Sequence, residues 1–193
     1  MFKSIEKFLS DVPLTREYFP KVSKQYKSLY IDVTKNKRIG DIVTFDKTKF
    51  KLYVPSSPRY FIVALKKPVK RTSLKIIYFR NEKDRDYAYI LINSSFTYWW
   101  WRVRDGGMTL SLETLLSVPL LDFNLNKNII NKLEKSELTN RVYKQNAGEA
   151  QENVKHSQAL LTKLNDLVYC EYSSILTQLH ENSEFTRLWK SKI

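Results

Sequence analysis

The chain has 193 residues, 42% of them hydrophobic, and a formal net charge of +13. This length and composition indicate a folded protein with one core, or a core with a helical appendage, and exclude a disordered basic tail. The single cysteine, Cys170, excludes an internal disulfide framework. Because the chain opens without a secretory leader and no apolar run approaches the roughly 18 residues of a membrane span, we expect a cytoplasmic protein without a membrane partner.

The positive charge belongs to the first half of the chain. Residues 1–104 contain 23 lysines and arginines against 9 acidic residues, whereas residues 105–193 contain 10 against 11. A strongly basic half beside a neutral half is typical of a nucleic-acid binder. The alternative is a basic protein whose charge only keeps it soluble.

The first predicted elements are a helix and a sheet. Residues 1–20 show a short amphipathic pattern, and we expect residues 1–34 to form a helical lead-in. Alternating β-branched and aromatic residues then predict a mainly antiparallel sheet. Its four expected strands cover residues 42–45, 50–54, 60–65 and 74–79. A β-rich domain is therefore expected over residues 35–120.

Residues 86–103 predict one helix, since they lack glycine and proline, and the turn Asp105-Gly106-Gly107 should end it. It carries three adjacent tryptophans, residues 99–101, which fan over about 200° on a helix and cannot all face one core. We expect them to form the seam between the sheet and the C-terminal helices. The small polar residues 93–95 are expected to let this helix pack closely.

The last part of the chain predicts two helices. Leu125, Ile129 and Leu133 share one helical face, and a second stripe runs from Val154 to Leu179. The turn over residues 146–148 separates them, which indicates a C-terminal α-helical hairpin within residues 121–193. The expected fold class is thus α+β: a small mainly antiparallel sheet with a packed aromatic helix, followed by this hairpin.

Motifs for catalysis are missing from the sequence. The four glycines are too dispersed for a dinucleotide or methyl-donor loop, and no Gly-x-Ser-x-Gly elbow is present. No Asp-x-Lys or Glu-x-Lys pair occurs, and His156, Cys170 and His180 lack the spacing of a zinc site. We therefore expect no catalytic residue, no metal site and no cofactor in this chain, with an unrecognised active site as the remaining alternative.

The order of several motifs resembles a known family. The segments that carry the resemblance cover residues 59–69, 73–79, 91–101, 105–106 and 117–120. Together they resemble the C-terminal target recognition (TaqI-like specificity) domain of adenine-N6 DNA methyltransferases, above all that of the fused type IIG restriction-modification enzymes. Residues 164–169 are similar to the tail of those proteins, so the resemblance covers about residues 35–180 and is strongest over residues 91–119.

This resemblance implies sequence-specific binding of double-stranded DNA. The methyltransferase or nuclease that acts on the DNA would then lie on a fused domain or on a separate chain, because the catalytic portion of that family is absent here. The chain would be an excised domain or a separately encoded specificity subunit. The family pattern implies the scaffold and not the base-reading residues, so no base contact is transferred.

The candidate DNA contacts are therefore chosen on physical grounds. Seven cations fall in turns between predicted strands and are expected to reach phosphates: Lys35, Lys37, Arg38, Lys66, Lys67, Lys70 and Arg71. Three arginines are expected to pair with a guanine edge: Arg59, Arg102 and Arg104. For each of them the alternative is a solvated surface cation.

Two other functions stay open at this stage. In the first, the chain is a protein-interaction or assembly subunit whose helical hairpin docks onto a partner while the basic half binds nucleic acid nonspecifically. In the second, it is an anti-restriction factor that mimics a specificity subunit.

Overall fold

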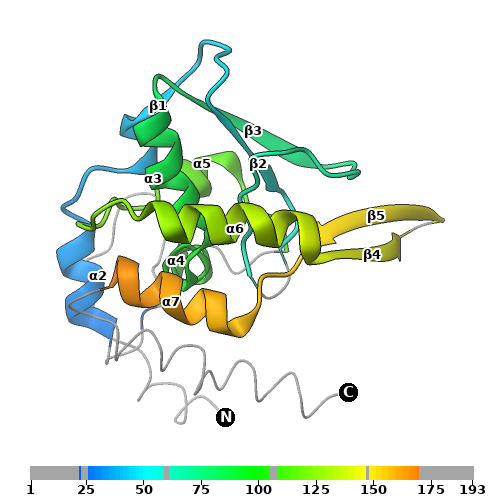
Figure 1. Ribbon diagram of the computed structural model, residues 1–193. Helices are drawn as coiled ribbons and strands as arrows, with labels where there is room; N and C mark the ends of the chain where they lie inside the picture. The colour runs from blue at the N-terminus through cyan, green and yellow to red at the C-terminus, as the bar shows by residue number, and fades with distance from the viewer. Residues whose placement is uncertain (1–21, 23–25, 59–60, 105–107, 147, 170–193) are drawn as a thin grey trace, which may run out of the picture.

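The computed structural model describes residues 22, 26–58, 61–104, 108–146 and 148–169 (Figure 1). This part of the chain is an α+β fold with two small antiparallel sheets, which confirms the expected class. In chain order its elements are α2 (Lys27–Val33), η2 (Ile39–Asp41), β1 (Val43–Thr44), β2 (Lys51–Pro55), β3 (Leu74–Phe79), α3 (Glu82–Asn93), α4 (Ser95–Arg104), α5 (Leu112–Leu116), α6 (Lys127–Thr139), β4 (Arg141–Asn146), β5 (Glu149–Val154) and α7 (Gln158–Val168). The predicted helix over residues 1–20 lies outside the described residues.

The larger sheet has β3 in the centre, antiparallel to β1 and to β2. Leu52 faces Ile77 across β2 and β3, and both side chains are buried beneath α3. The alternation of apolar and polar residues therefore predicted these three strands correctly, because it follows the buried and exposed faces of the sheet.

The predicted strand over residues 60–65 is wrong. Only Leu65 makes a ladder contact, an isolated bridge to Tyr53, and residues 61–64 are irregular. The backbone of Ala64 and of Lys66 bonds to side chains instead. The amide of buried Asn93 accepts from the N–H of Ala64 at 3.1 Å and donates to its carbonyl at 2.9 Å. The Glu137 carboxylate accepts from the N–H of Lys66 at 3.0 Å. These side chains satisfy backbone groups that a neighbouring strand would otherwise bond.

The predicted helix over residues 86–103 is in fact two helices. Ser94 has ψ 160°, which ends α3, and its hydroxyl donates to the Leu91 carbonyl at 2.6 Å. Asn165 of α7 accepts from the backbone N–H of Ser95 at 2.9 Å and donates to its hydroxyl at 2.8 Å. A side chain from a distant element thus satisfies one of the free backbone N–H groups at the start of α4.

All three adjacent tryptophans are buried, with exposed fractions of 6% for Trp99, 2% for Trp100 and 2% for Trp101. Burial on several sides is achieved because α4 packs against α3, α5 and α7, while aromatic residues of the α2 region cover it as well. Trp100 stacks on Tyr30 of α2 with ring centroids 5.6 Å apart and donates to the Ser117 hydroxyl at 3.0 Å. Helix α2 therefore also packs against these tryptophans, which was not expected from the sequence.

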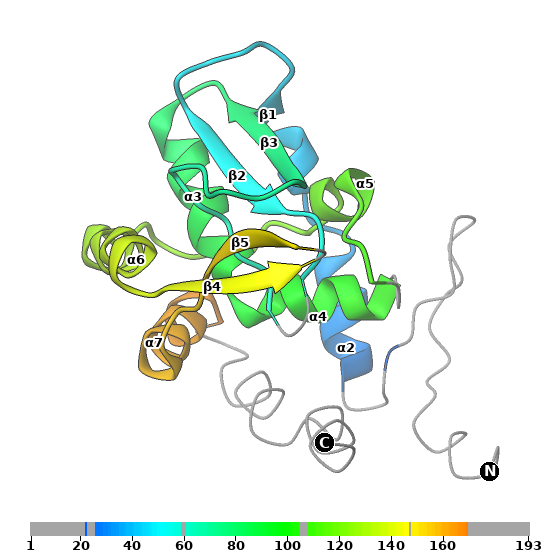
Figure 2. The same ribbon diagram turned by 90° about the vertical axis from the view of Figure 1, so that its right-hand side faces the viewer.

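The C-terminal region departs from a simple helical hairpin. Helices α6 and α7 pack together, as expected, but the β4–β5 hairpin connects them. The turn predicted between two helices lies at the tip of this hairpin, where Gly148 has φ 82°. Figure 1 shows the hairpin projecting from the body of the molecule, and in Figure 2 it faces the viewer. Beyond Tyr169 the predicted helical stripe lies outside the described residues.

One cluster of buried residues contains side chains from all three predicted regions. It includes Leu29 of α2, Leu52 of β2, Trp100 of α4, Leu133 of α6 and Leu164 of α7. A second small cluster joins Val63, Leu65 and Val69 to Val154 of β5. In the described part of the chain, no helix is both long and apolar enough to cross a membrane.

Candidate nucleic-acid interface

The β4–β5 hairpin, hereafter the ribbon, is the most prominent surface feature. Its strands pair in register from Arg141 with Val154 to Asn146 with Glu149. Val154 anchors the base in the small apolar cluster, while Tyr143 farther out is 71% exposed. Lys144 and Gln145 are exposed too. The ribbon thus has a fixed base and an accessible outer part.

A basic segment runs beside the base of the ribbon. The backbone N–H of Glu152 donates to the Lys70 carbonyl at 2.9 Å, and the N–H of Lys70 donates to the Glu152 carboxylate at 3.0 Å. These bonds and the guanidinium of Arg141 hold the pKa of the Glu152 carboxyl below its usual range. Arg71 donates to the side chain of Asn153 and to the carbonyl of Ser57, the latter at 3.2 Å.

Cations outnumber acids where the ribbon and this segment meet. On the ribbon strands the acids are Glu149 and Glu152, and Glu152 is already bound to Arg141 and Lys70. The side chains with full or partial exposure are Lys67, Lys70, Arg71, Arg141, Lys144 and Lys155. The structure therefore brings three of the sequence-predicted contacts, Lys67, Lys70 and Arg71, to the base of the ribbon.

The other predicted contacts lie elsewhere. Lys35, Lys37 and Arg38 are exposed between α2 and η2, where the Lys37 carbonyl accepts from the N–H of Leu120 at 2.7 Å. This connection is at the left of Figure 1 and the ribbon at the right. Arg59 lies outside the described residues. The predicted contacts therefore do not form one surface.

Arg102 and Arg104, near the end of α4, are half-buried against its tryptophans. The guanidinium carbon of Arg102 lies 5.4 Å from the Trp101 ring centroid, and that of Arg104 lies 5.5 Å from the Trp100 ring centroid. Such cation–π packing stabilises the helix end. Their pairing with guanine stays a prediction.

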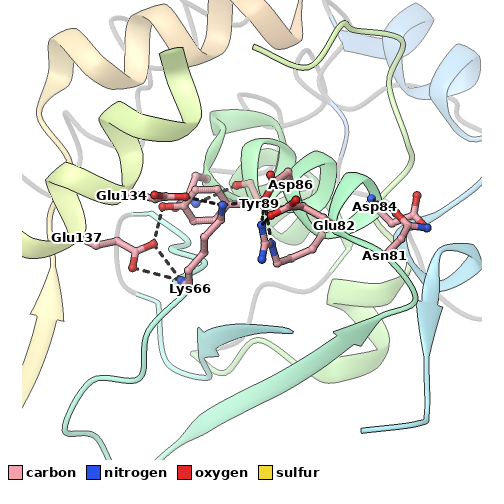
Figure 3. Close-up of polar contacts among 10 residues, drawn as sticks. Lys66, Asn81, Glu82, Asp84, Asp86, Tyr89, Glu134 and Glu137 are labelled. Atoms are coloured by element: carbon pink, nitrogen blue, oxygen red, sulfur yellow. Dashed lines mark hydrogen bonds and ion pairs between the residues drawn. The ribbon is translucent and has the colours of Figure 1, made fainter. Parts of the chain in front are cut away.

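Lys66 is part of a partly buried charged cluster (Figure 3). Its amino group lies 2.8 Å from the Asp86 carboxylate and also contacts Glu134, and its side chain is 15% exposed. It therefore links α3 to α6, and we leave it out of the candidate interface. Burial raises the pKa of the neighbouring Glu137, whose carboxylate accepts from the Tyr89 hydroxyl.

The ribbon was missed by sequence reasoning. Its strands are rich in Lys, Gln, Asn and Glu and lack the apolar alternation of a half-buried strand. The useful signal was the Asn-Ala-Gly turn between two segments of equal length, because a glycine in a tight turn also marks a β-hairpin. Among the described residues, no group of three or more His, Cys, Asp or Glu is arranged to hold a metal ion.

Comparisons with known proteins returned no matching family model, no similar curated protein and no similar solved structure.

Proposed function

We propose that the chain binds double-stranded DNA in a sequence-dependent manner. It would act as the target recognition part of an adenine methyltransferase or restriction-methylation enzyme whose catalytic domain is fused to it or supplied by another chain. The observation that supports this most directly is the projecting ribbon with cations at its base.

The geometry of the ribbon suits a DNA groove. The major groove admits a two-stranded β-ribbon, and glutamine side chains pair with adenine edges there. Gln145 lies on the exposed outer part of the ribbon. Lys67 and Lys70 at the base are placed to contact phosphates, which supply affinity and orientation but no sequence information. A division of roles follows: Gln145 reads a base and the basal lysines hold the backbone.

Selection of bound duplexes from a random DNA pool at about 150 mM salt tests this proposal, because nonspecific phosphate binding is already weakened there. The full chain should enrich one short motif that contains adenine. Gln145→Ala should relax the preference at one position by about 1–3 kcal/mol. The matched control, Gln158→Ala at the exposed start of α7, should retain the motif. Uniform recovery of all duplexes by the full chain would overturn sequence recognition.

A second candidate function is an assembly subunit with nonspecific nucleic-acid binding. It is favoured by three exposed apolar side chains near the start of the ribbon, Leu138, Val142 and Tyr143. If these residues form a protein interface, Leu138→Ser should abolish co-purification of a partner while the duplex pool stays unenriched. Enrichment of one motif, unaffected by Leu138→Ser, would favour the first function.

A further inference from the structure

We infer that the cleft between α6 and α7 binds a phosphate group, and that this group is a phosphodiester of the DNA backbone. The site is argued from the cleft itself, whereas its assignment to DNA rests on the function proposed above. The cleft has a volume of about 290 Å³. Its polar lining includes Lys132, Lys135, Ser136, Asn140, Ser157 and Lys163.

Three lysines line the cleft without a compensating acid. Lys132 and Lys135 lie on α6 and Lys163 lies on α7, so the charge comes from both walls, and no carboxylate belongs to the lining. Within the described ranges none of the three forms an ion pair, in contrast to Lys66. Cations gathered in this way repel one another, and a bound phosphate would relieve the repulsion.

Hydrogen bonds fix the two walls of the cleft. The Ser136 hydroxyl lies 2.8 Å from Nδ1 of His156 and 3.1 Å from the side-chain nitrogen of Asn140. These contacts tie the end of α6 to the segment that precedes α7. At the rim, the Ser157 hydroxyl accepts from the N–H of Leu160 at 3.3 Å. Its own proton has no acceptor within the described part of the chain, so it can be donated to a phosphate oxygen.

The cleft opens at the base of the ribbon. Asn140 leads directly into β4, and Ser157 follows β5 by three residues and caps α7. Figure 2 shows α6 and α7 beside the start of β4 and the end of β5. A ribbon that enters the major groove has a sugar-phosphate backbone on either side. The cleft is thus placed to hold a phosphate of the DNA backbone at the edge of this groove, while the ribbon contacts the bases inside the groove.

The first test uses inorganic phosphate and the full chain. NMR titration should shift the amide signals of residues 132–140 and 157–163, and the effect should disappear in the variant Lys132→Gln/Lys135→Gln/Lys163→Gln. The matched control Lys47→Gln/Lys83→Gln/Lys127→Gln removes the same charge at exposed positions outside the cleft and should keep the shifts. Absence of localised shifts in the unmodified chain would overturn the site.

The second test identifies the source of the phosphate. The slope of log K against log salt for a duplex should become shallower by about 0.9 for each lost phosphate contact in the cleft variant, and should be unchanged in the control. Localised phosphate shifts with an unchanged duplex slope would overturn the DNA assignment in favour of a free phosphate compound. If inorganic phosphate causes localised shifts but the chain binds no duplex, the proposed function is overturned, and only the phosphate site in the cleft is supported.

Discussion

His156 shows how one buried side chain makes stability depend on pH. Burial lowers the pKa of its imidazole to about 4, from the usual 6.5. The folded state therefore keeps the imidazole neutral over a range in which the unfolded chain binds a proton. The stability is fully present above the unfolded pKa and is lost as the pH falls toward the folded pKa.

We expect the free energy of unfolding to decrease by up to about 3 kcal/mol between pH 7 and pH 4 because of this residue. Urea denaturation at a series of pH values measures it, and His156→Gln should remove this part of the pH dependence. Glu137, whose pKa is raised by burial, contributes in the opposite direction, so the comparison is between the two proteins at each pH. Parallel pH curves for the two proteins would contradict this role of His156.

Asn93 is the second decisive residue, because it bonds to the backbone of a segment 29 residues away in sequence. Asn93→Ala would leave the buried N–H and carbonyl of Ala64 without partners. The expected cost is about 2–6 kcal/mol, measured as the change in the free energy of unfolding by urea, since each of the two unsatisfied buried groups costs about 1–3 kcal/mol. Asn131→Ala, at an exposed position of α6, is the control and should change stability by less than about 0.5 kcal/mol.

At the scale of elements, the ribbon depends on a glycine at its tip. Gly148 has φ 82°, a backbone conformation that costs other L-residues about 1–2 kcal/mol, although asparagine adopts it more readily. Gly148→Ala should therefore accelerate hydrogen exchange of the ribbon amides, and Gly148→Asn should do so less. The midpoint of global unfolding should move little in either variant, because Val154 is the ribbon residue that joins a buried cluster. Equal exchange in the two variants would contradict the requirement for this turn conformation.

At the scale of the whole molecule, the shared core predicts a single cooperative transition. Trp189→Phe leaves only the tryptophans of α4 as fluorescent indoles. In this background the urea curves from fluorescence and from far-UV circular dichroism should coincide. Leu133→Ala in α6 should move both curves together and cost about 2–5 kcal/mol, because Leu133 is fully buried in the main cluster. A fluorescence curve that does not respond to Leu133→Ala would show that residues 121–193 form a separate domain.

The sequence by itself determined the features that depend on neighbours along the chain. Alternation located β2 and β3, and the spacing of Ile129, Ile130 and Leu133 located α6, because a periodic apolar pattern directly reflects which face of an element is buried. The charge asymmetry came from composition, and the basic candidates Lys67, Lys70 and Arg71 came from their position in turns between predicted strands. Fold class followed from these local signals.

Tertiary structure decided the features that depend on partners far apart in sequence. Asn93 bonds to the backbone of Ala64 in place of a neighbouring strand, and Asn165 bonds to Ser95 where the chain turns between α3 and α4. Lys66 was predicted from the sequence to be a surface cation. In the folded chain, Asp86 of α3 and Glu134 of α6 form ion pairs with it. The ribbon likewise depends on strand pairing, because its polar strands carry no apolar period that the sequence could reveal. The cleft with its three lysines depends on the packing of α6 against α7.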